Sequence, residues 1–181
     1  MANWCCTDIV MEGAKENIQK LYEDLGQAKD DWLGRVAFDI LGIDWNDIPC
    51  RGWMNGEPGL YIDEHIGHIR MIWITAWNPC YELQNKLADK YDLSVYFIAN
   101  ESELSIHETN DVEGKFFPCR YIWGSEEYEC FEELAEDFVR IHGGEVKDFS
   151  HLKERLLVEE EEPDYKHMVE YTIVDNMGNI K

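Results

Sequence analysis

The densest group of potential metal ligands in the sequence is formed by Asp63, Glu64, His65 and His68. Two histidines three residues apart, together with carboxylates, can bind zinc or another divalent ion. Three-residue spacing suits one face of a helix, whereas this segment has the strand pattern of a hairpin. The sequence therefore leaves two interpretations, a metal site or a solvated turn, and the hairpin pattern favours the turn.

Thiol chemistry depends on six cysteines, which are Cys5, Cys6, Cys50, Cys80, Cys119 and Cys130. Adjacent residues of a strand point to opposite faces, so we expect one thiol of the first pair to be buried, with no neighbour that activates either. Cys80 falls in the first turn of a predicted helix, where the helix dipole would favour its thiolate, and burial against a sheet is the alternative. Because no signal-peptide pattern opens the chain, we interpret the protein as cytoplasmic and expect reduced, mostly buried thiols.

Other catalytic and cofactor signatures are absent from the sequence. It contains no G-x-S-x-G elbow, no Walker A loop and no G-x-G-x-x-G fingerprint. We therefore expect a non-enzymatic protein without a cofactor. Four aromatic residues could form an RNA-stacking platform on a sheet, but without basic motif residues we interpret them as core: Trp73, Trp77, Tyr96 and Phe97.

Acidic residues dominate the composition, with 38 Asp and Glu against 16 Lys and Arg and a formal charge of −22. Such a surface repels phosphate, so we expect no direct binding to nucleic acid or to anionic membranes. No apolar run approaches the roughly 18 residues of a membrane span. The acidic excess is larger in the second half, where residues 101–181 contain 22 acidic and 8 basic residues.

Acidic side chains are densest in one predicted helix, where seven of 12 residues are acidic: Glu126, Glu127, Glu129, Glu132, Glu133, Glu136 and Asp137. As a helix this segment would span roughly 18 Å, or about one charge per 2.6 Å, against about 1.7 Å in duplex DNA. An ordinary solvated helix face is one interpretation. The other is a surface that binds the cationic, nucleic-acid-binding face of a partner protein.

Two further hypotheses use other parts of the chain. A small-molecule or metal-binding protein, or a hydrolase, could place its site where the loop 43–59 meets the sheet, with six candidate residues: Asp44, Asp47, Arg51, Asp63, Glu64 and His65. A plain structural subunit would instead show a large exposed apolar patch or a stable oligomer.

The hydrophobic pattern predicts an α+β protein. Strands are predicted over 4–12, 60–65, 69–77, 93–99, 104–108, 115–123 and 166–174, and helices over 14–25, about 31–41, 79–91, 125–142 and 150–157. Asn78 and Pro79 are the expected start of the third helix. This order predicts a ferredoxin-like split βαβ core over 1–124, with an antiparallel sheet and helices on one face. An acidic extension over 125–181, packed on the same domain, would contain a solvated linker at 159–164.

Three short motifs resemble one protein family. Ala2-Asn3-Trp4-Cys5, followed by a strand and Gly13, resembles the start of the YubB-like ferredoxin-like family. Thr75-Ala76-Trp77-Asn78-Pro79 before a helix, and Leu87-Ala88-Asp89-Lys90-Tyr91 before a strand, are similar to the same family. The resemblance covers about residues 2–124, and Thr7 stands where the family has Asn. It implies a ferredoxin-like fold and an uncharacterised accessory protein of plasmids, phages and other bacterial mobile elements, and it implies no catalytic residue.

Overall fold

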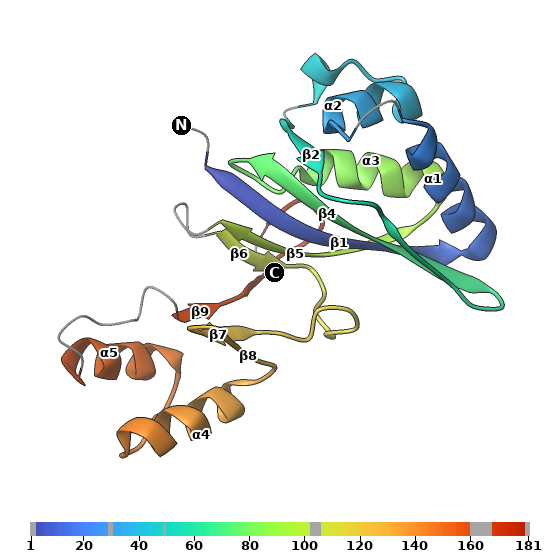
Figure 1. Cartoon of the computed structure of the whole chain (residues 1–181). Coiled ribbons are helices and arrows are strands. Elements are labelled where there is room, and N and C mark those ends of the chain that lie inside the picture. The colour runs from blue at the N-terminus through green and yellow to red at the C-terminus, as the bar shows by residue number, and fades with distance from the viewer. Residues whose placement is uncertain (1–2, 29–30, 49, 102–105, 160–167, 180–181) are drawn as a thin grey trace. The chain divides into compact units, whose positions relative to one another are not determined.

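The chain divides into two compact units (Figure 1). A computed structural model describes residues 3–28, 31–48, 50–101, 106–159 and 168–179. The large unit comprises Met1–Val112 and Ile173–Lys181, and the small unit comprises Glu113–Thr172. The division therefore falls at 112/113 rather than at the predicted 124/125, because the strand before residue 124 pairs with strands that follow it. The predicted α+β class with antiparallel sheets is confirmed.

The large unit is organised around β1 (Trp4–Ala14), which pairs antiparallel with β4 (Ile66–Ala76) and with β5 (Ser94–Glu101). The strand order is β10-β6-β5-β1-β4-β2, and β3 pairs with β4. The shorter strands of this sheet are β2 (Gly52–Met54), β3 (Gly59–Ile62), β6 (Ile106–Thr109) and β10 (Thr172–Ile173). The interior position predicted for β5 is confirmed.

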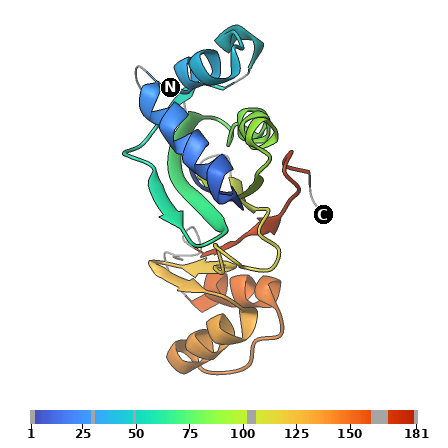
Figure 2. The same cartoon turned by 90° about the vertical axis from the view of Figure 1, so that its right-hand side faces the viewer.

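One face of this sheet is covered by α1 (Lys15–Gln27), α2 (Leu33–Val36) and α3 (Tyr81–Tyr91), as Figures 1 and 2 show. Successive strand residues point to opposite faces, so alternate residues of β1 enter the core under the helices. The core joins strand residues such as Ile9, Trp73 and Phe97 to helix residues such as Leu21 and Leu87. Burial of this apolar layer is the main favourable contribution to the stability of the unit.

The second predicted helix is helical over Leu33–Leu41, but it changes type part-way along. The α-helix ends at Val36 and continues as a π-helical turn over Ala37–Leu41, and Gly42 ends it with a φ of 69°, as predicted. The predicted loop 43–59 also contains regular structure, because Trp45–Asp47 form a 3₁₀ turn and β2 pairs with β4. Three-residue elements of this kind are too short to produce a hydrophobic period.

The start of α3 also differs from the prediction. The helix begins at Tyr81, and Cys80 is its N-cap in a left-handed conformation, with a φ of 59°. Asn78 does cap a backbone group, since its Oδ1 accepts a hydrogen bond from the Cys80 N–H at 2.8 Å, but this bond closes a turn before the helix. Trp77 has a φ of 68° and is 49% exposed, so its assignment to the core was wrong.

The small unit is a three-stranded antiparallel sheet with the order β8-β7-β9, packed against α4 (Phe131–His142) and α5 (Phe149–Glu159). The strands are β7 (Tyr121–Trp123), β8 (Glu126–Tyr128) and β9 (Met168–Glu170). Its core contains Leu134 and Phe138 of α4, Leu152 and Leu156 of α5, and Met168 of β9. Apolar residues at three- and four-residue spacing thus place one face of each helix inside.

Three predictions for this region need correction. The helix predicted from Ser125 starts at Phe131, because Gly124, with a φ of 63°, makes a tight turn that returns the chain as β8. The strand predicted from Lys115 starts at Tyr121, beyond Pro118, which lacks an N–H for sheet pairing. The last predicted strand is two short ones, β9 and β10. Of the linker predicted at 159–164, all but Glu159 lies outside the described residues.

Candidate functional site

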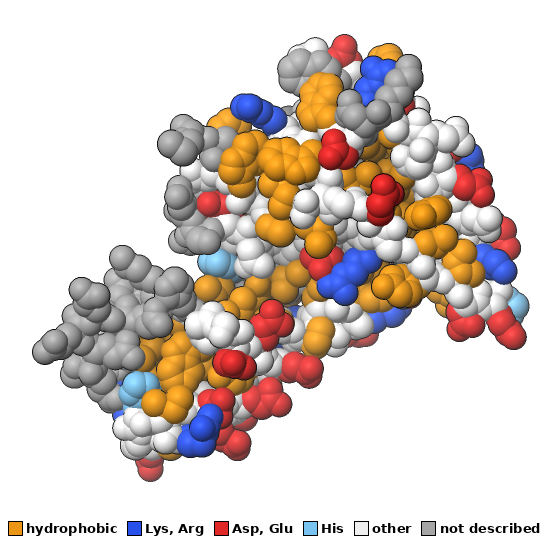
Figure 3. Space-filling model, in the orientation of Figure 1, with side chains coloured by type: hydrophobic (Ala, Val, Ile, Leu, Met, Phe, Trp, Pro, Cys, Tyr) orange, Lys and Arg blue, Asp and Glu red, His pale blue; other side chains and the backbone are white. Residues whose placement is uncertain are grey.

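The acidic residues predicted as one helix are divided between two elements of the small unit. Glu126 and Glu127 lie on β8, Glu129 lies between β8 and α4, and the other four lie on the first two turns of α4. Six of the seven are exposed, and Asp137 is half-buried. Figure 3 shows acidic side chains gathered over β8 and along α4. We call the set Glu126, Glu127, Glu129, Glu132, Glu133, Glu136 and Asp137 the acidic surface.

Cations neutralise little of the acidic surface. Asp137 accepts a hydrogen bond from Arg140 at 2.9 Å and one from the Tyr128 hydroxyl at 3.2 Å, and the Arg140 guanidinium lowers the pKa of Asp137 below its ordinary value. Burial, together with Asp137, raises the pKa of Tyr128. Within the part of the chain that the structure describes, none of the six glutamates forms an ion pair with a basic side chain.

The glutamates on α4 have only a partial structural role. Glu133 accepts a hydrogen bond from the Glu129 N–H at 3.3 Å, and an acidic side chain in the first turn is favoured by the helix dipole. Glu136 lies one turn after Glu132, and like charges four residues apart destabilise a helix. The apolar face of α4 explains why the helix forms, but it does not explain why the outer face is acidic.

The predicted metal ligands lie on the β3–β4 hairpin. Asp63, Glu64 and His65 are exposed in its turn, where the Asp63 N–H donates to the Ile66 carbonyl at 2.9 Å. The ring of His68 stacks on Tyr61 with 4.7 Å between centroids. Among the described residues, no group of three or more His, Cys, Asp or Glu side chains is arranged to hold a metal ion. The hairpin thus spreads these four residues along a turn and a strand.

The residues of the alternative small-molecule or hydrolase site do not converge. The Arg51 carbonyl accepts a hydrogen bond from Ala76 at one end of β4, and Asp63 bonds to Ile66 at the other end. The eleven residues of β4 separate these ends by roughly 33 Å. Asp44 holds its own local turn, since its Oδ1 accepts from the Asn46 N–H at 2.9 Å. The structure therefore places Arg51 and Asp63 at opposite ends of β4 rather than side by side.

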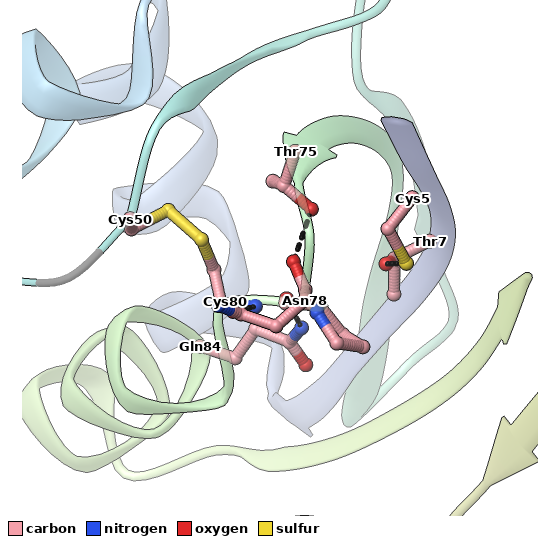
Figure 4. The surroundings of a disulfide bond; sticks show 8 residues. Cys5, Thr7, Cys50, Thr75, Asn78, Cys80 and Gln84 are labelled. Carbon is pink, nitrogen blue, oxygen red and sulfur yellow. Dashed lines mark hydrogen bonds between the residues drawn. A yellow bond between two sulfur atoms is a disulfide. The ribbon is translucent and has the colours of Figure 1, made fainter. Parts of the chain in front are cut away.

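The expectation of six reduced cysteines was wrong. Cys50 and Cys80 form a disulfide with 5.3 Å between their Cα atoms, although they are 30 residues apart in sequence (Figure 4). The pairing of β2 with β4 brings Cys50, two residues before β2, next to Cys80, the residue that precedes α3. Both cysteines line a cavity of about 170 Å³ together with Ile48, Asn78 and Met177.

Cys5 and Cys6 behave as the strand pattern predicts, since the first is fully buried and the second is exposed. Burial raises the pKa of Cys5 to about 11, and burial also raises that of Cys6. Both thiols are therefore protonated near neutral pH and are poor nucleophiles. Sequence reasoning also missed a partly buried polar contact, the hydrogen bond from the Tyr81 hydroxyl to Glu108, and burial together with this bond raises the pKa of Tyr81.

Of the four aromatic residues considered as an RNA platform, Trp73 and Phe97 are fully buried and Tyr96 is half-buried.

Within the described residues, no helix is long and apolar enough to cross a membrane. No protein-family model, curated protein or solved structure matches this chain. What the molecule can bind therefore follows from its own residues.

Proposed function

We propose that this chain is a non-enzymatic accessory protein that binds a basic partner protein through the acidic surface of the small unit. The observation that supports this most directly is a set of exposed glutamates on β8 and α4 without basic partners in the described structure. Like charges on adjacent turns oppose helix formation, so a requirement other than stability would explain their retention.

The net charge strengthens the proposal. The sequence of the small unit contains 17 acidic and 7 basic residues, a formal charge of −10 in 60 residues. A field of this sign steers a cationic surface toward the molecule and suppresses encounters with acidic proteins. Because the charges are divided between a strand and a helix, their spacing is not the single helical row that the comparison with duplex DNA assumed. We therefore expect recognition of a basic protein surface, including one that binds nucleic acid.

The biological setting is proposed from the family resemblance. The order β1, α1, β3, β4, α3, β5, with the strand order β3-β4-β1-β5 and helices on one face, is compatible with a ferredoxin-like arrangement. We propose on this basis a YubB-like protein of a bacterial mobile element that acts in the cytoplasm. The fold alone permits many functions, so the binding proposal rests on the acidic surface.

A charge-matched pull-down tests the proposal. The tagged chain is incubated with bacterial lysate treated with nuclease, and bound proteins are eluted with a salt gradient and identified by mass spectrometry. The test variant replaces Glu129, Glu132, Glu133 and Glu136 with Gln, which keeps the side-chain acceptor of Glu133. The control variant makes the same substitution at four exposed glutamates of the large unit: Glu16, Glu23, Glu57 and Glu64.

We expect wild type and control to retain the same basic protein, and the test variant to lose it while staying folded. Elution at moderate salt is expected because exposed charge pairs are screened. If the partner binds DNA, adding the wild-type chain should displace a bound duplex from it. Equal retention by the test variant, or no retained basic protein at any salt, would refute the proposal.

A further inference from the structure

The Cys50–Cys80 disulfide joins two segments with different surroundings. Cys50 lies between the 3₁₀ turn and β2, and Cys80 is the N-cap residue of α3. Both side chains are largely buried, with 7% and 4% of their surface exposed. Both residues line a cavity of about 170 Å³, and we expect a small thiol to approach the bond from this side. Figure 4 shows the bond beside the turn that contains Asn78.

The two sulfurs differ as leaving groups. Cys80 stands at the N-terminus of an eleven-residue helix, where unpaired N–H groups and the dipole favour a thiolate. Glu82 in the same turn would oppose this charge, but it lies 3.4 Å from Lys86 in an ion pair. Cys50 lies outside any helix, and its N–H donates to the Ile48 carbonyl at 2.7 Å. A thiolate that attacks Cys50 therefore expels the better leaving group.

The turn that presents Cys80 is held by contacts other than the disulfide. The Thr75 hydroxyl donates to the Asn78 carbonyl at 2.5 Å, and the Cys80 N–H donates to the Asn78 side chain. The buried Gln84 amide donates to the Pro79 carbonyl at 2.6 Å. These bonds maintain the left-handed conformation of Cys80, which is unfavourable for a residue other than glycine. The turn should therefore persist when the disulfide opens.

The Cys50 side of the bond has fewer anchors. Within the described residues from Asp44 to Cys50, the backbone hydrogen bonds that the structure shows are local, from Asp47 to Asp44 and from Cys50 to Ile48. Ile48 is buried, and the disulfide adds a covalent link to α3. Opening the bond would release this segment while leaving the α3 turn in place.

We propose that Cys50–Cys80 is a reversible thiol–disulfide exchange site whose substrate is a dithiol reductant. The thiolate of the dithiol bonds to Cys50 Sγ, the S–S bond breaks, and its electron pair passes to Cys80 Sγ. The second thiol of the reductant then attacks the mixed disulfide and releases Cys50 as a thiolate. The protein disulfide gains two electrons, the dithiol becomes a disulfide, and the protons of the dithiol account for the two cysteine thiols.

This site lies in the large unit and is independent of the acidic surface. In a reducing compartment, disulfides are usually transient, catalytic or redox-sensing rather than permanent cross-links. Reversible opening would therefore allow the segment that carries Cys50 to change its attachment to α3 with the redox state of its surroundings.

Two measurements on the full-length protein test the proposal. In the first, oxidised protein is treated with glutathione, quenched in acid, alkylated and mapped by mass spectrometry. We expect the mixed disulfide on Cys50 and a free thiol on Cys80, in several-fold excess over the reverse pattern. In the second, hydrogen exchange is compared before and after reduction with dithiothreitol under native conditions. Exchange should rise more over residues 43–50 than over 77–84.

The Cys50→Ala/Cys80→Ala variant is the control, and its exchange should be the same with and without dithiothreitol. Three results would overturn the proposal. These are free thiols at both positions in protein purified without reductant, a bond that resists dithiothreitol until the protein unfolds, and a mixed disulfide found mainly on Cys80.

Discussion

Opening the Cys50–Cys80 disulfide should substantially lower the free energy of unfolding of the large unit. The size of this loss can be calculated from the length of the loop that the bond closes. The bond closes a loop with a sequence separation of 30 residues. In the chain-entropy account, such a loop restricts the unfolded ensemble by about 3.6 kcal/mol at 25 °C. With a urea dependence of about 2 kcal/mol per molar, the denaturation midpoint should fall by about 1.8 M on reduction.

Tryptophan fluorescence is a suitable probe, because six of the seven tryptophans belong to the large unit and only Trp123 belongs to the small one. Wild-type protein is unfolded in urea with and without a reductant, so no side-chain packing is removed in the comparison. The Cys50→Ala/Cys80→Ala variant should be insensitive to the reductant, since the other four cysteines are free thiols in both states. A midpoint shift below about 0.3 M on complete reduction would show that the loop is already ordered in the unfolded ensemble and refute this reasoning.

Three further predictions concern single side chains. A Cβ at Gly52 would lie 2.2 Å from a backbone oxygen of β4, so Gly52→Ala should lower the free energy of unfolding, measured in urea, by about 1–3 kcal/mol. The control is Gly26→Ala, which should be neutral or stabilising because a Cβ there would have nothing within 4 Å. The Tyr91 hydroxyl donates a hydrogen bond to Asp24 and lowers the pKa of that carboxyl in the folded state. The bond therefore stabilises the fold fully above the pKa of Asp24 in the unfolded chain, about 3.9, and this stabilisation is lost as the pH falls through the lower pKa of the folded state. The stability advantage of wild type over Tyr91→Phe should therefore shrink below about pH 4 in acid titrations, and a constant difference would contradict it. Glu136→Gln removes a like charge one turn from its neighbour and should slow hydrogen exchange in α4 by about twofold, whereas faster exchange would show that the charge stabilises the helix.

Long periodic segments of this chain could be predicted from sequence because their signals are local. β1, α1, β4, α3 and β5 each contain several alternating or helically spaced apolar residues, and each was placed within a few residues of its observed bounds. The elements that were missed are short or depend on a turn. Gly124 with a positive φ converts the predicted start of a helix into β8, and a Gly-Ser pair between strand residues was the available signal for that hairpin.

The composition of the candidate surface was predictable, but its geometry was not. Counting charges identified the acidic segment, since it requires no knowledge of distant contacts. Whether Glu126 and Glu132 belong to one helix depends on the β7–β8 turn, and whether Arg51 approaches Asp63 depends on how the hairpin runs along β4. Both are questions of three-dimensional pairing, which residue types alone do not answer.

The disulfide shows this limit most clearly. Nothing near Cys50 and Cys80 in sequence identifies them as partners of each other, and six cysteines permit 15 complete pairings. The distinction arises when β2 pairs with β4, because this places Cys50, two residues before β2, beside the turn that precedes α3. Which cysteines are cross-linked is therefore decided by the non-local pairing of two strands. The chemistry of the Cys50–Cys80 disulfide can be inferred only once that strand pairing is known.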